Sequence, residues 1–588
     1  MQSIRSNHPW QANTAARTIS GAVRELAYRA ASEADRSAGR ADLARLESPL
    51  ALAPNSIGNL TRAADAIRAA IGNHTPISVF GDYDADGVTA SAILYLMLRQ
   101  LGAVISGVRL PRRMSEGYGI KAESVQELIS ANPHGLLILV DNGITALEPV
   151  RLARESGLTV IVLDHHLPMD TGELPEAHIL VDQHVPSLAG STAQPSYFED
   201  YCGAGLAYRL ACLLLSGSTI PGAEACLTQC VALAAIGTVC DMVPLYDDNR
   251  VIVREGLDAL KERRVTPGLA LLAERLLRPP VNEQSFAFHL GPAINACGRL
   301  YDDDARNARL PFRLLAANVS SDSGRQQLRT MAEEIVRINY ERRSAVEDAV
   351  RRLSPMLVDD PGLPILLFDE SGFTHEGVVG IVAGKFASEY GRSAYVFTKG
   401  ENGLYKGSAR IAGEDHIREK LDRVHALHPD IFRSYGGHTE AAGVAITVEG
   451  REAFREALYA AYRGAGYHGF DVSAVSYDVL LRPQEVPAAY QELQRYAPYG
   501  TGCPEPAVCV TGCSVTDVRY LGGEGQHVRL STPDGFQVIA FQQAAAYQAM
   551  GEPDTVDVVG HLSVNSFQGN DTLQLTASAI RRAEPMEG

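Results

Sequence analysis

The chain has 588 residues, of which 46% are hydrophobic and 21% are charged. This balance is typical of a globular protein and excludes a disordered or fibrous one, and the length predicts three or four domains, each with its own core. The formal net charge of −17 argues against the basic surface that nucleic-acid binders usually carry, although carboxylates gathered around metal ions would give the same total.

The cysteines and the apolar runs exclude two further classes of protein. The nine cysteines form no paired framework, and Cys503, Cys509 and Cys513 fit no common zinc spacing, so we interpret them as reduced, buried thiols. No apolar run approaches about 20 residues and the N-terminus mixes Arg with Glu and Asp, so neither a membrane span nor a signal peptide is predicted. We therefore expect a cytoplasmic protein without a membrane partner.

Two regions are predicted in the first half of the chain. Residues 1–74 carry Ala, Arg and acidic residues at helical spacing and predict a helical N-terminal region. In residues 75–319, short β-rich apolar runs alternate with longer helical patterns, which is typical of a parallel sheet covered by helices on both faces. The clearest strands are Ile77–Phe80, Leu136–Val140, Val160–Leu163 and Ile179–Val181. Each is followed by Asp or Gly-Asp, which places acidic residues at the edge where parallel sheets bind ligands.

The sharpest motif is GDYDADG at Gly81–Gly87, between a predicted strand and a predicted helix over Val88–Leu101. Three carboxylates at alternating positions in a tight turn repel one another unless cations bind among them. An EF-hand loop also opens with D-x-D-x-D-G, but it requires a preceding helix and a Glu at its twelfth position, where this chain has Ile93. A solvated acidic turn without a ligand stays as the alternative.

Further metal-ligand candidates follow other apolar segments. Asp141 and Asp241 each follow one, although an isolated Asp at such a point more often caps a turn or helix. Asp164, His165 and His166 follow the third strand and offer one ring to a metal, one ring to a phosphate and a carboxylate that orients them. Oxygen and nitrogen ligands without a nearby thiolate favour Mn²⁺ or Mg²⁺, and two such ions sharing a carboxylate suit phosphoryl hydrolysis.

The second half of the chain predicts a connector and two more domains. Residues 320–354 contain an uninterrupted polar helical pattern over Ser323–Leu353, which is typical of a helix between domains. A second α/β pattern follows in residues 355–470. Residues 471–588 alternate apolar and polar positions between Gly and Pro turns, which predicts a small closed β-barrel. Its expected strands are Val508–Val510, Val515–Val518, Val528–Leu530, Val538–Phe541 and Val556–Val559.

In this order, the motifs resemble those of the DHH phosphoesterase family, and within it the RecJ subgroup, from about residue 45 onward. GDYDADG resembles the first motif of the family, and Asp164-His165-His166 resembles the motif that gives the family its name. Further matching blocks are SEGYG (115–119), CGAG (202–205), AIGTVCDMVPL (235–245), INACGR (294–299), HEGVVGIVAGKF (375–386), GSAR (407–410), GGHTEAAG (436–443) and PYGTGCPEP (498–506). The chain departs from the family at Ala409 and Cys503, where Gly and Asn are usual, and it lacks a Trp upstream of HEGVVG.

The resemblance implies an α/β fold in which a DHH parallel-sheet domain is joined by a long helix to a smaller α/β DHHA1 domain, with a C-terminal OB-type β-barrel. It implies two divalent ions, Mn²⁺ or Mg²⁺, and makes Asp141 the shared ligand. Asp84 and Asp141 would hold one ion, and Asp86, Asp141, His165 and Asp241 the other. Asp82 would be a ligand or lie just behind the ligands, Asp164 would orient the histidines, and His166 would face the scissile phosphate.

The resemblance also implies residues that grip a nucleic acid. Arg113, Arg299 and Arg410 with Ser408 would contact phosphates through the guanidinium fork, with Asn295 in the same group. Gly436, Gly437 and His438 would let the backbone approach a phosphate or sugar closely. Tyr118 would stack on a base, with a packed core tyrosine as the alternative.

The activity that the resemblance implies is that of a single-strand-specific 5′→3′ DNA exonuclease, which releases 5′-mononucleotides in DNA repair and recombination. Single-stranded DNA would be the substrate, and a single-strand-binding protein and a helicase would be partners. Two alternatives stay open: a DHH enzyme acting on cyclic dinucleotides or very short oligonucleotides, and a scaffold that has kept the fold but lost catalysis.

Overall fold

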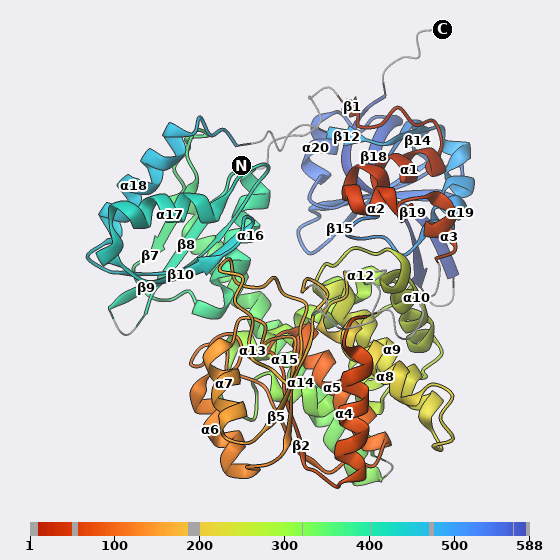
Figure 1. The fold of residues 1–588 in the computed structure, drawn as a ribbon. Helices are drawn as coiled ribbons and strands as arrows, with labels where there is room; N and C mark the ends of the chain where they lie inside the picture. Colours follow the sequence, from red (N-terminus) through yellow and green to blue (C-terminus); the bar gives the residue numbers. More distant parts are fainter. Residues whose placement is uncertain are drawn as a thin grey trace. The chain divides into compact units, whose positions relative to one another are not determined.

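The computed structural model describes residues 10–49, 57–185, 200–319, 321–400, 403–469, 475–567 and 570–583 (Figure 1). They fall into two compact units. The first unit is Met1–Asn295, Asp303–Val336 and Ala474–Gly588, and the second is Ala296–Asp302 and Arg337–Ser473. The N-terminal, parallel-sheet and C-terminal parts of the chain therefore share the first unit.

The first unit contains a five-stranded parallel sheet with the order β3-β2-β4-β5-β6. The strands are β2 (Ile77–Phe80), β3 (Ile105–Arg109), β4 (Leu136–Val140), β5 (Thr159–Leu163) and β6 (Ile179–Val181). Every residue of β2 and β4 is buried, as expected for strands covered on both faces. The four predicted strands are confirmed to within one residue, whereas β3, a half-exposed edge strand, was not predicted.

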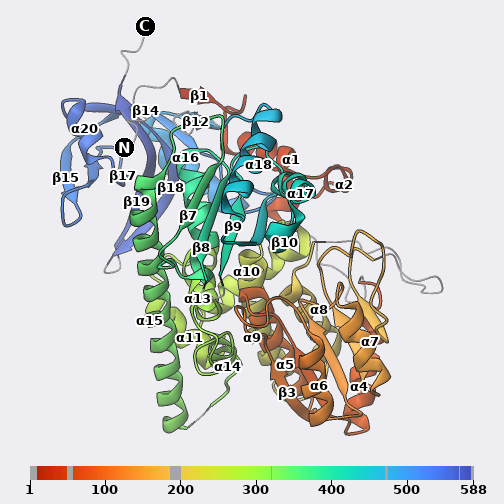
Figure 2. The same cartoon turned by 90° about the vertical axis from the view of Figure 1, so that its left-hand side faces the viewer.

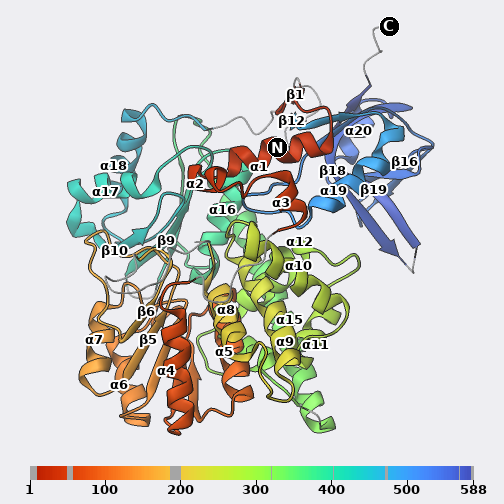
Figure 3. The same cartoon turned by 45° about the vertical axis from the view of Figure 1, so that its right-hand side comes forward.

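Helices cover both faces of this sheet. The helices α6 and α7 lie beside the sheet (Figure 3). Phe80, Leu137 and Val160 pack with Val125 of α6 and Val150 of α7 in one buried cluster. On the other side, α5 packs against α8 and α9. The helices of the first unit are α1 (Ile19–Ala30), α2 (Glu33–Ser37), α3 (Leu43–Glu47), α4 (Leu60–Gly72), α5 (Ala85–Gln100), α6 (Ala122–Ala131), α7 (Leu147–Glu155), α8 (Gly203–Leu215), α9 (Ala223–Cys240), α10 (Asp247–Lys261), α11 (Pro267–Leu276), α12 (Glu283–Ser285), α14 (Arg309–Leu315), α19 (Val486–Tyr496) and α20 (Ala544–Ala549).

The helix α9 is long and strongly apolar. Among the described residues it is the one helix long and apolar enough to cross a membrane by length and composition, and 61% of it is buried inside the protein. It packs against α5, α8 and α10, and a helix that is apolar on all sides is suited to such a core.

Two helices run from the first unit into the second. They are α13 (Gly291–Leu300) and α15 (Asp322–Leu353), and the latter is a single helix of 32 residues (Figure 2). The prediction of a long uninterrupted helix over Ser323–Leu353 is confirmed to within one residue.

The second unit contains a mixed five-stranded sheet with the order β10-β11-β9-β8-β7. Only β7 and β8 are parallel, and the other neighbours are antiparallel. Two buried clusters lie against the sheet, one including Phe386 of α16 and the other including Leu421 of α17 and Phe454 of α18. The elements are β7 (Ile365–Asp369), α16 (Val379–Tyr390), β8 (Ala394–Lys399), β9 (Leu404–Arg410), α17 (Ile417–Leu427), β10 (Phe432–Gly437), β11 (Ala441–Thr447) and α18 (Arg451–Gly464).

The C-terminal part of the first unit is a seven-stranded sheet with the order β13-β14-β18-β19-β17-β16-β15. The predicted OB-type barrel is confirmed: β14 and β15 are separated only by Val515 and Thr516, and this bent stretch of chain pairs with β18 through β14 and with β16 through β15, which brings the two ends of the strand order together. The strands β13 and β19 were not predicted. The strands are β13 (Val479–Leu481), β14 (Val508–Ser514), β15 (Asp517–Leu521), β16 (His527–Ser531), β17 (Phe536–Ala540), β18 (Thr555–Phe567) and β19 (Asn570–Arg582).

The N-terminal region contains a strand as well as the expected helices. The strand β1 (Trp10–Ala12) pairs in parallel with β12 (Val475–Tyr477), and α1 packs against α19. The guanidinium of Arg581 lies 4.3 Å from the centroid of the Trp10 ring, within cation–π range. The strand β1 and the helix α1 thus pack on the C-terminal part of the chain.

A buried arginine ties several segments of the first unit together. Arg250 of α10 is fully buried and donates from Nε to the carbonyl of Leu46 at 2.5 Å. Its Nη1 donates to the carbonyls of Pro498 at 2.9 Å and Leu245 at 3.3 Å, and its Nη2 donates to the carbonyl of Tyr496. Because segments far apart in sequence share these donors, Arg250 fixes the N-terminal helices and the segment after α19 to α10.

Candidate metal centre

The residues predicted as metal ligands and catalytic groups come together at the carboxyl ends of the parallel strands. Their ligand atoms form three groups, each within 4.8 Å. The groups are Asp82 with Asp84 and Asp141; Asp86 with His165 and Asp241; and Asp141 with Asp164, His165 and His166. Since Asp141 and His165 each belong to two groups, the three groups form one continuous centre.

The loop between β2 and α5 is folded tightly enough to bring three carboxylates together. The helix α5 begins at Ala85, three residues earlier than predicted, because Asp84 caps it by accepting the Gly87 N–H at 3.0 Å. A Cβ atom on Gly87 would lie 2.6 Å from the Asp82 nitrogen, so only glycine fits there. Asn295 accepts the Ala85 N–H at 2.8 Å and holds the loop from α13.

The N-terminus of α8 holds Asp86. Its Oδ2 accepts the Gly203 N–H at 2.7 Å, and its Oδ1 accepts the Ala204 N–H at 2.9 Å, where the helix dipole also favours a negative charge. A Cβ on Gly203 would lie 2.6 Å from the Asp141 Cβ, and one on Gly237 would lie 2.5 Å from Asp86 Oδ1. These glycines stand in the blocks CGAG and AIGTVCDMVPL, but their role was not identified from the sequence.

Asp141 occupies a constrained position. Its φ of 60° lies in the left-handed region, which Asp and Asn tolerate better than most residues. Its N–H donates to the Leu163 carbonyl at 3.0 Å, and its Oδ1 lies 3.0 Å from Nε2 of His165. The backbone therefore turns this carboxylate, which is 2% exposed, into the centre.

Asp164 orients the two histidines. It is fully buried, and its Oδ1 accepts the His165 N–H at 2.8 Å and lies 2.8 Å from His166 Nδ1, while Oδ2 accepts the Ile144 N–H at 2.9 Å. Burial raises the pKa of Asp164, but the hydrogen bonds from His166 and Ile144 outweigh burial, so its net pKa is lowered. The Asp164 carboxylate is therefore ionised, and both of its oxygens accept hydrogen bonds.

The two histidines therefore differ in charge. Burial lowers the pKa of His165, and the neighbouring His166 lowers it further, so His165 is neutral with a lone pair free for a metal. Burial also lowers the pKa of His166, but the hydrogen bond to Asp164 raises it to about 9, so this ring is an imidazolium at neutral pH. A cationic ring beside the carboxylates is suited to contact a phosphate.

The other carboxylates of the centre lie close together without enough positively charged side chains nearby to offset their negative charge. Burial raises the pKa values of Asp82, Asp84, Asp141 and Asp241, and the neighbouring carboxylates raise them further. Asp82 Oδ1 is buried without a hydrogen-bond partner among the described residues. Divalent cations would satisfy this oxygen and allow the carboxylates to ionise together, so the donor set fits two such ions.

Three predicted nucleic-acid contacts lie in the first unit. The Arg113 guanidinium lies 4.8 Å from the centroid of the Tyr83 ring, inside the GDYDADG loop. Tyr118 is 37% exposed, and its hydroxyl lies 3.1 Å from His166 Nδ1. Asn295 uses its side-chain oxygen to hold the Ala85 N–H, so the structure gives it a supporting contact within the loop.

The other predicted contacts form a separate cluster in the second unit. Arg410 donates to Ser408 Oγ at 2.8 Å, and the register pairs Ser408 with Gly443 and Gly443 with Gly436 across neighbouring strands. At Gly437, φ is +137° and a Cβ would lie 2.2 Å from the Ala441 carbonyl oxygen, so glycine is required.

Two more predicted contact residues, His438 and Arg299, belong to the second unit. The His438 N–H donates to the Ala441 carbonyl at 2.9 Å, and Arg299 donates to the Gly377 carbonyl at 3.5 Å. A Cβ on Gly380 would lie 3.0 Å from Arg410 Nη2, so the start of α16 packs directly on this arginine. The cluster thus combines guanidinium groups with a backbone free of bulky side chains.

Three parts of the chain match known domain families. Residues 76–238 match the DHH family N-terminal domain, residues 365–464 match the DHHA1 domain, and residues 477–579 match the RecJ OB domain. Together with the acidic centre at the sheet edge, these matches define a DHH phosphoesterase.

The single-stranded-DNA-specific exonuclease RecJ of Thermus thermophilus is 33% identical over 549 residues, which cover 92% of this chain and 74% of that protein. The chain belongs to the RecJ family.

Two solved structures of that Thermus thermophilus RecJ are similar to this chain. The one in complex with Mn²⁺ has a TM-score of 0.76 and 29% sequence identity, and covers 98% of this chain and 80% of that one. The one in complex with Mg²⁺ has a TM-score of 0.68 and 28% identity, and covers 98% and 79%. The α/β fold, the long helix and the C-terminal OB domain are therefore confirmed.

We expect Gly237→Ala to weaken the metal centre. Its Cβ would lie 2.5 Å from both Asp86 Oδ1 and the Ala204 Cβ, so the carboxylate must shift. Displacing a ligand in this way should lower Mn²⁺ affinity by about 10- to 100-fold, measured by calorimetric titration. Gly72→Ala is the control, because a Cβ there meets nothing within 4 Å. Equal Mn²⁺ affinity in both variants would contradict this account of Gly237.

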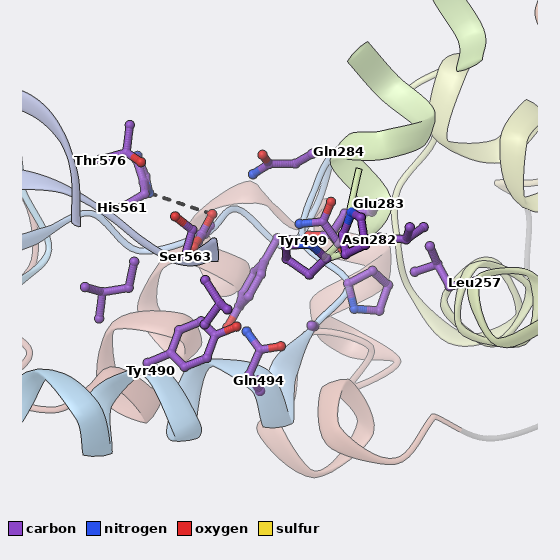
Figure 4. Close-up of a pocket in the computed structure, with 18 of the residues that line it drawn as sticks. Leu257, Asn282, Glu283, Gln284, Tyr490, Gln494, Tyr499, His561, Ser563 and Thr576 are labelled. Carbon is purple, nitrogen blue, oxygen red and sulfur yellow. Dashed lines mark ion pairs between the residues drawn. The ribbon is translucent and has the colours of Figure 1, made fainter. Parts of the chain in front are cut away.

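A separate cavity of about 1060 Å³ lies in the first unit, between α10, the segment before α12, α19 and the hairpin of β18 and β19 (Figure 4). No predicted site residue lines it. Glu283 and Glu505 both face it, and His561 Nδ1 lies 3.8 Å from Glu505 Oε2. Burial, with a further contribution from Glu283, raises the pKa of Glu505 to about 7.

We expect Glu505→Gln to stabilise the protein at alkaline pH. The folded pKa of about 7 lies above that of an unfolded Glu, about 4.3, so the stability tied to this group is present at low pH and lost as pH rises through 7. Gln removes this loss, so the free energy of unfolding should rise by roughly 1–3 kcal/mol at pH 8.5 and by less at pH 5 in urea titrations.

The exposed Glu524→Gln provides the control for this prediction, because it removes a charge from the same sheet region without changing a buried group. A gain for Glu505→Gln that did not depend on pH would show that the raised pKa has no part in it.

Proposed function

We propose that this protein is a single-strand-specific 5′→3′ DNA exonuclease that hydrolyses phosphodiester bonds and releases 5′-mononucleotides. The observation that carries the proposal is the convergence of the Asp and His side chains at one sheet edge, in a chain of the RecJ family. DNA repair and recombination are the processes in which such an activity would serve.

The metal assignment follows the three ligand groups. Asp84 and Asp141 would hold one Mn²⁺ or Mg²⁺, and Asp86, Asp141, His165 and Asp241 the other, with Asp82 close enough to contribute its orphaned oxygen. Two such ions, when bound, supply a hydroxide nucleophile and neutralise charge on the entering and leaving oxygens.

The remaining side chains of the centre orient and polarise the substrate. His166, held as an imidazolium by Asp164, would donate to an oxygen of the scissile phosphate or stabilise the leaving 3′ oxygen. Because Asp164 also accepts the N–H groups of His165 and Ile144, it fixes the direction of both rings.

The two groups of predicted contacts would grip the strand. Arg113 would bind a phosphate in the first unit, with Asn295 supporting the loop and Tyr118 offering its exposed ring to a base. In the second unit, Arg299, Ser408 and Arg410 would bind phosphate oxygens, while Gly436, Gly437 and His438 would admit the backbone of the strand.

The domain assignment and the setting of the enzyme complete the proposal. The domains would be the N-terminal region (1–74), the DHH domain (75–319), the connecting helix (320–354), the DHHA1 domain (355–470) and the OB domain (471–588). The enzyme would act in the cytoplasm, on strands delivered by a single-strand-binding protein and a helicase.

Digestion of end-labelled DNA tests the proposal. We expect Mn²⁺-dependent release of mononucleotides from the 5′ end of single strands, and little release from blunt duplexes or from the 3′ end. A series of strand lengths separates the alternatives, because a hydrolase for dinucleotides would prefer the shortest substrates. Binding without hydrolysis at any length would instead indicate a scaffold.

A further inference from the structure

The hydroxyl of Tyr118 joins the metal centre from a loop that contributes none of the candidate ligands. It lies 3.1 Å from His166 Nδ1 and donates to the Asp141 main-chain carbonyl at 3.3 Å. The Tyr118 and His166 rings meet edge to face, with centroids 5.3 Å apart. One phenol thus contacts both the imidazolium and the backbone of the carboxylate shared by two ligand groups.

The hydrogen bonds define what each atom does. His166 Nδ1 lies 2.8 Å from Asp164 Oδ1, so its proton points mainly at this carboxylate. The Tyr118 proton points at the Asp141 carbonyl, which leaves the phenol oxygen as a second acceptor for the Nδ1 proton. The His166 ring is therefore held from two sides, by a carboxylate and by a phenol that is itself hydrogen-bonded to the Asp141 carbonyl.

The loop is built to present this hydroxyl. Gly117 has a φ of +75° and Gly119 a φ of +71°, so Tyr118 stands between two residues in the left-handed region. The N–H groups of Glu116 and Gly117 both donate to the Arg112 carbonyl, at 2.8 and 3.1 Å, and close a turn just before the tyrosine. This backbone path explains why glycine flanks the tyrosine in the SEGYG block.

The ring and the hydroxyl of Tyr118 can serve separate tasks. The side chain is 37% exposed, so part of the ring is open to a substrate base, whereas the hydroxyl points inward to His166 and Asp141. Removing the hydroxyl alone therefore leaves the stacking surface in place.

We propose that Tyr118 is a positioning residue whose hydroxyl fixes the His166 ring relative to Asp141, so that the ring meets the scissile phosphate in one orientation. This inference rests on the proposed exonuclease activity. Without the hydroxyl, the ring keeps its hydrogen bond to Asp164 and its ring contacts with His165 and residue 118, and we expect it to tilt about that one hydrogen bond. Misplacing a group that acts on the reacting phosphate slows the chemical step rather than substrate binding.

The test compares Tyr118→Phe, which removes only the hydroxyl, with Tyr118→Leu, which also removes the ring. We expect Tyr118→Phe to lower kcat by about 10- to 100-fold with little change in KM, and Tyr118→Leu to raise KM as well. Tyr28→Phe, at an exposed tyrosine of α1, is the control. An effect of Tyr118→Phe on KM alone would overturn the proposal.

A double-mutant cycle with His166→Ala shows whether the hydroxyl acts through the imidazolium. We expect Tyr118→Phe to change the residual kcat of the His166→Ala protein by less than about 2-fold. The same loss in both backgrounds would mean that the hydroxyl acts independently of His166, and would overturn the inference.

Nitrogen-15 spectra of histidine-labelled protein separate this inference from the proposed function, because they need no turnover. We expect the Nδ1 resonance of His166, assigned with the His166→Ala variant, to move in Tyr118→Phe and to stay in place in Tyr28→Phe. An unmoved resonance overturns the positioning role, whereas a wild-type protein that digests no DNA overturns the exonuclease.

Discussion

Replacing Asp141 with Asn is expected to abolish metal-dependent digestion while stabilising the metal-free protein. Asn keeps the shape of the side chain and tolerates the left-handed backbone at this position, so the fold should survive. Because Asp141 belongs to two of the three ligand groups, its loss should weaken both proposed ions and lower kcat by at least ~10³-fold. End-labelled DNA and Mn²⁺ titration measure the two effects.

The stabilisation follows from the direction of the pKa shift. Burial and the neighbouring carboxylates raise the pKa of Asp141 above that of an unfolded Asp, about 3.9. The stability tied to this group is therefore present at low pH and lost as pH rises through the folded pKa, and Asn removes that loss.

We expect the melting temperature of metal-free Asp141→Asn to exceed that of the wild type at pH 8, and to do so by less at pH 5. Added Mn²⁺ should raise the melting temperature of the wild type and leave that of the variant almost unchanged. The exposed Asp170→Asn is the control. An Asp141→Asn protein that digested DNA at the wild-type rate would refute the assignment of this site.

The second large effect is expected from Arg250→Met. The arginine is fully buried and donates to the carbonyls of four residues, Leu46, Leu245, Tyr496 and Pro498. Methionine fills part of the space but removes the Arg250 donor from all four carbonyls, of which Leu46 keeps a second donor, Arg254 Nη2 at 3.0 Å. Each buried group left unsatisfied costs about 1–3 kcal/mol. We expect the free energy of unfolding to fall by roughly 3–5 kcal/mol in urea titrations.

Two further variants make this result interpretable. Arg24→Met removes an exposed arginine of α1 and should change stability by less than about 0.5 kcal/mol. Arg250→Lys keeps the charge but not the planar fork, so its loss should be intermediate. A destabilisation of Arg250→Met no larger than that of Arg24→Met would show that the four carbonyls find other donors.

The central strands could be predicted from sequence because burial on both faces leaves a continuous apolar run, as in Leu136–Val140. The edge strand β3 contains the exposed Ser106 and Gly107, so it lacks that signal. The strand β1 has only three residues and exists because β12, more than 460 residues further along the chain, pairs with it. Local patterns do not record such a distant partner.

The candidate metal centre also has a part that could be predicted from sequence and a part that could not. Asp and His residues that follow predicted strands are recognisable from the sequence by residue type alone, so the carboxylates and imidazoles of the centre could be predicted. The groups that hold these side chains in place could not be predicted. They are the main-chain N–H groups of Gly203, Ala204 and Ile144, and the glycine positions where a Cβ atom would not fit. The capping role of Asp84 could have been found, since Asp is a favoured residue at the start of a helix.

Gly87, Gly203 and Gly237 come from three different helices, and each brings the backbone of its helix against a carboxylate residue of the centre. Helix backbone shifts less readily than side chains do. These carboxylates therefore have little room to move apart. Ca²⁺ prefers more oxygen ligands at longer distances than Mg²⁺, and it would require the cage to expand. Because these three glycines lie so close to the carboxylate residues, we expect the centre to bind Mg²⁺ or Mn²⁺ more tightly than Ca²⁺.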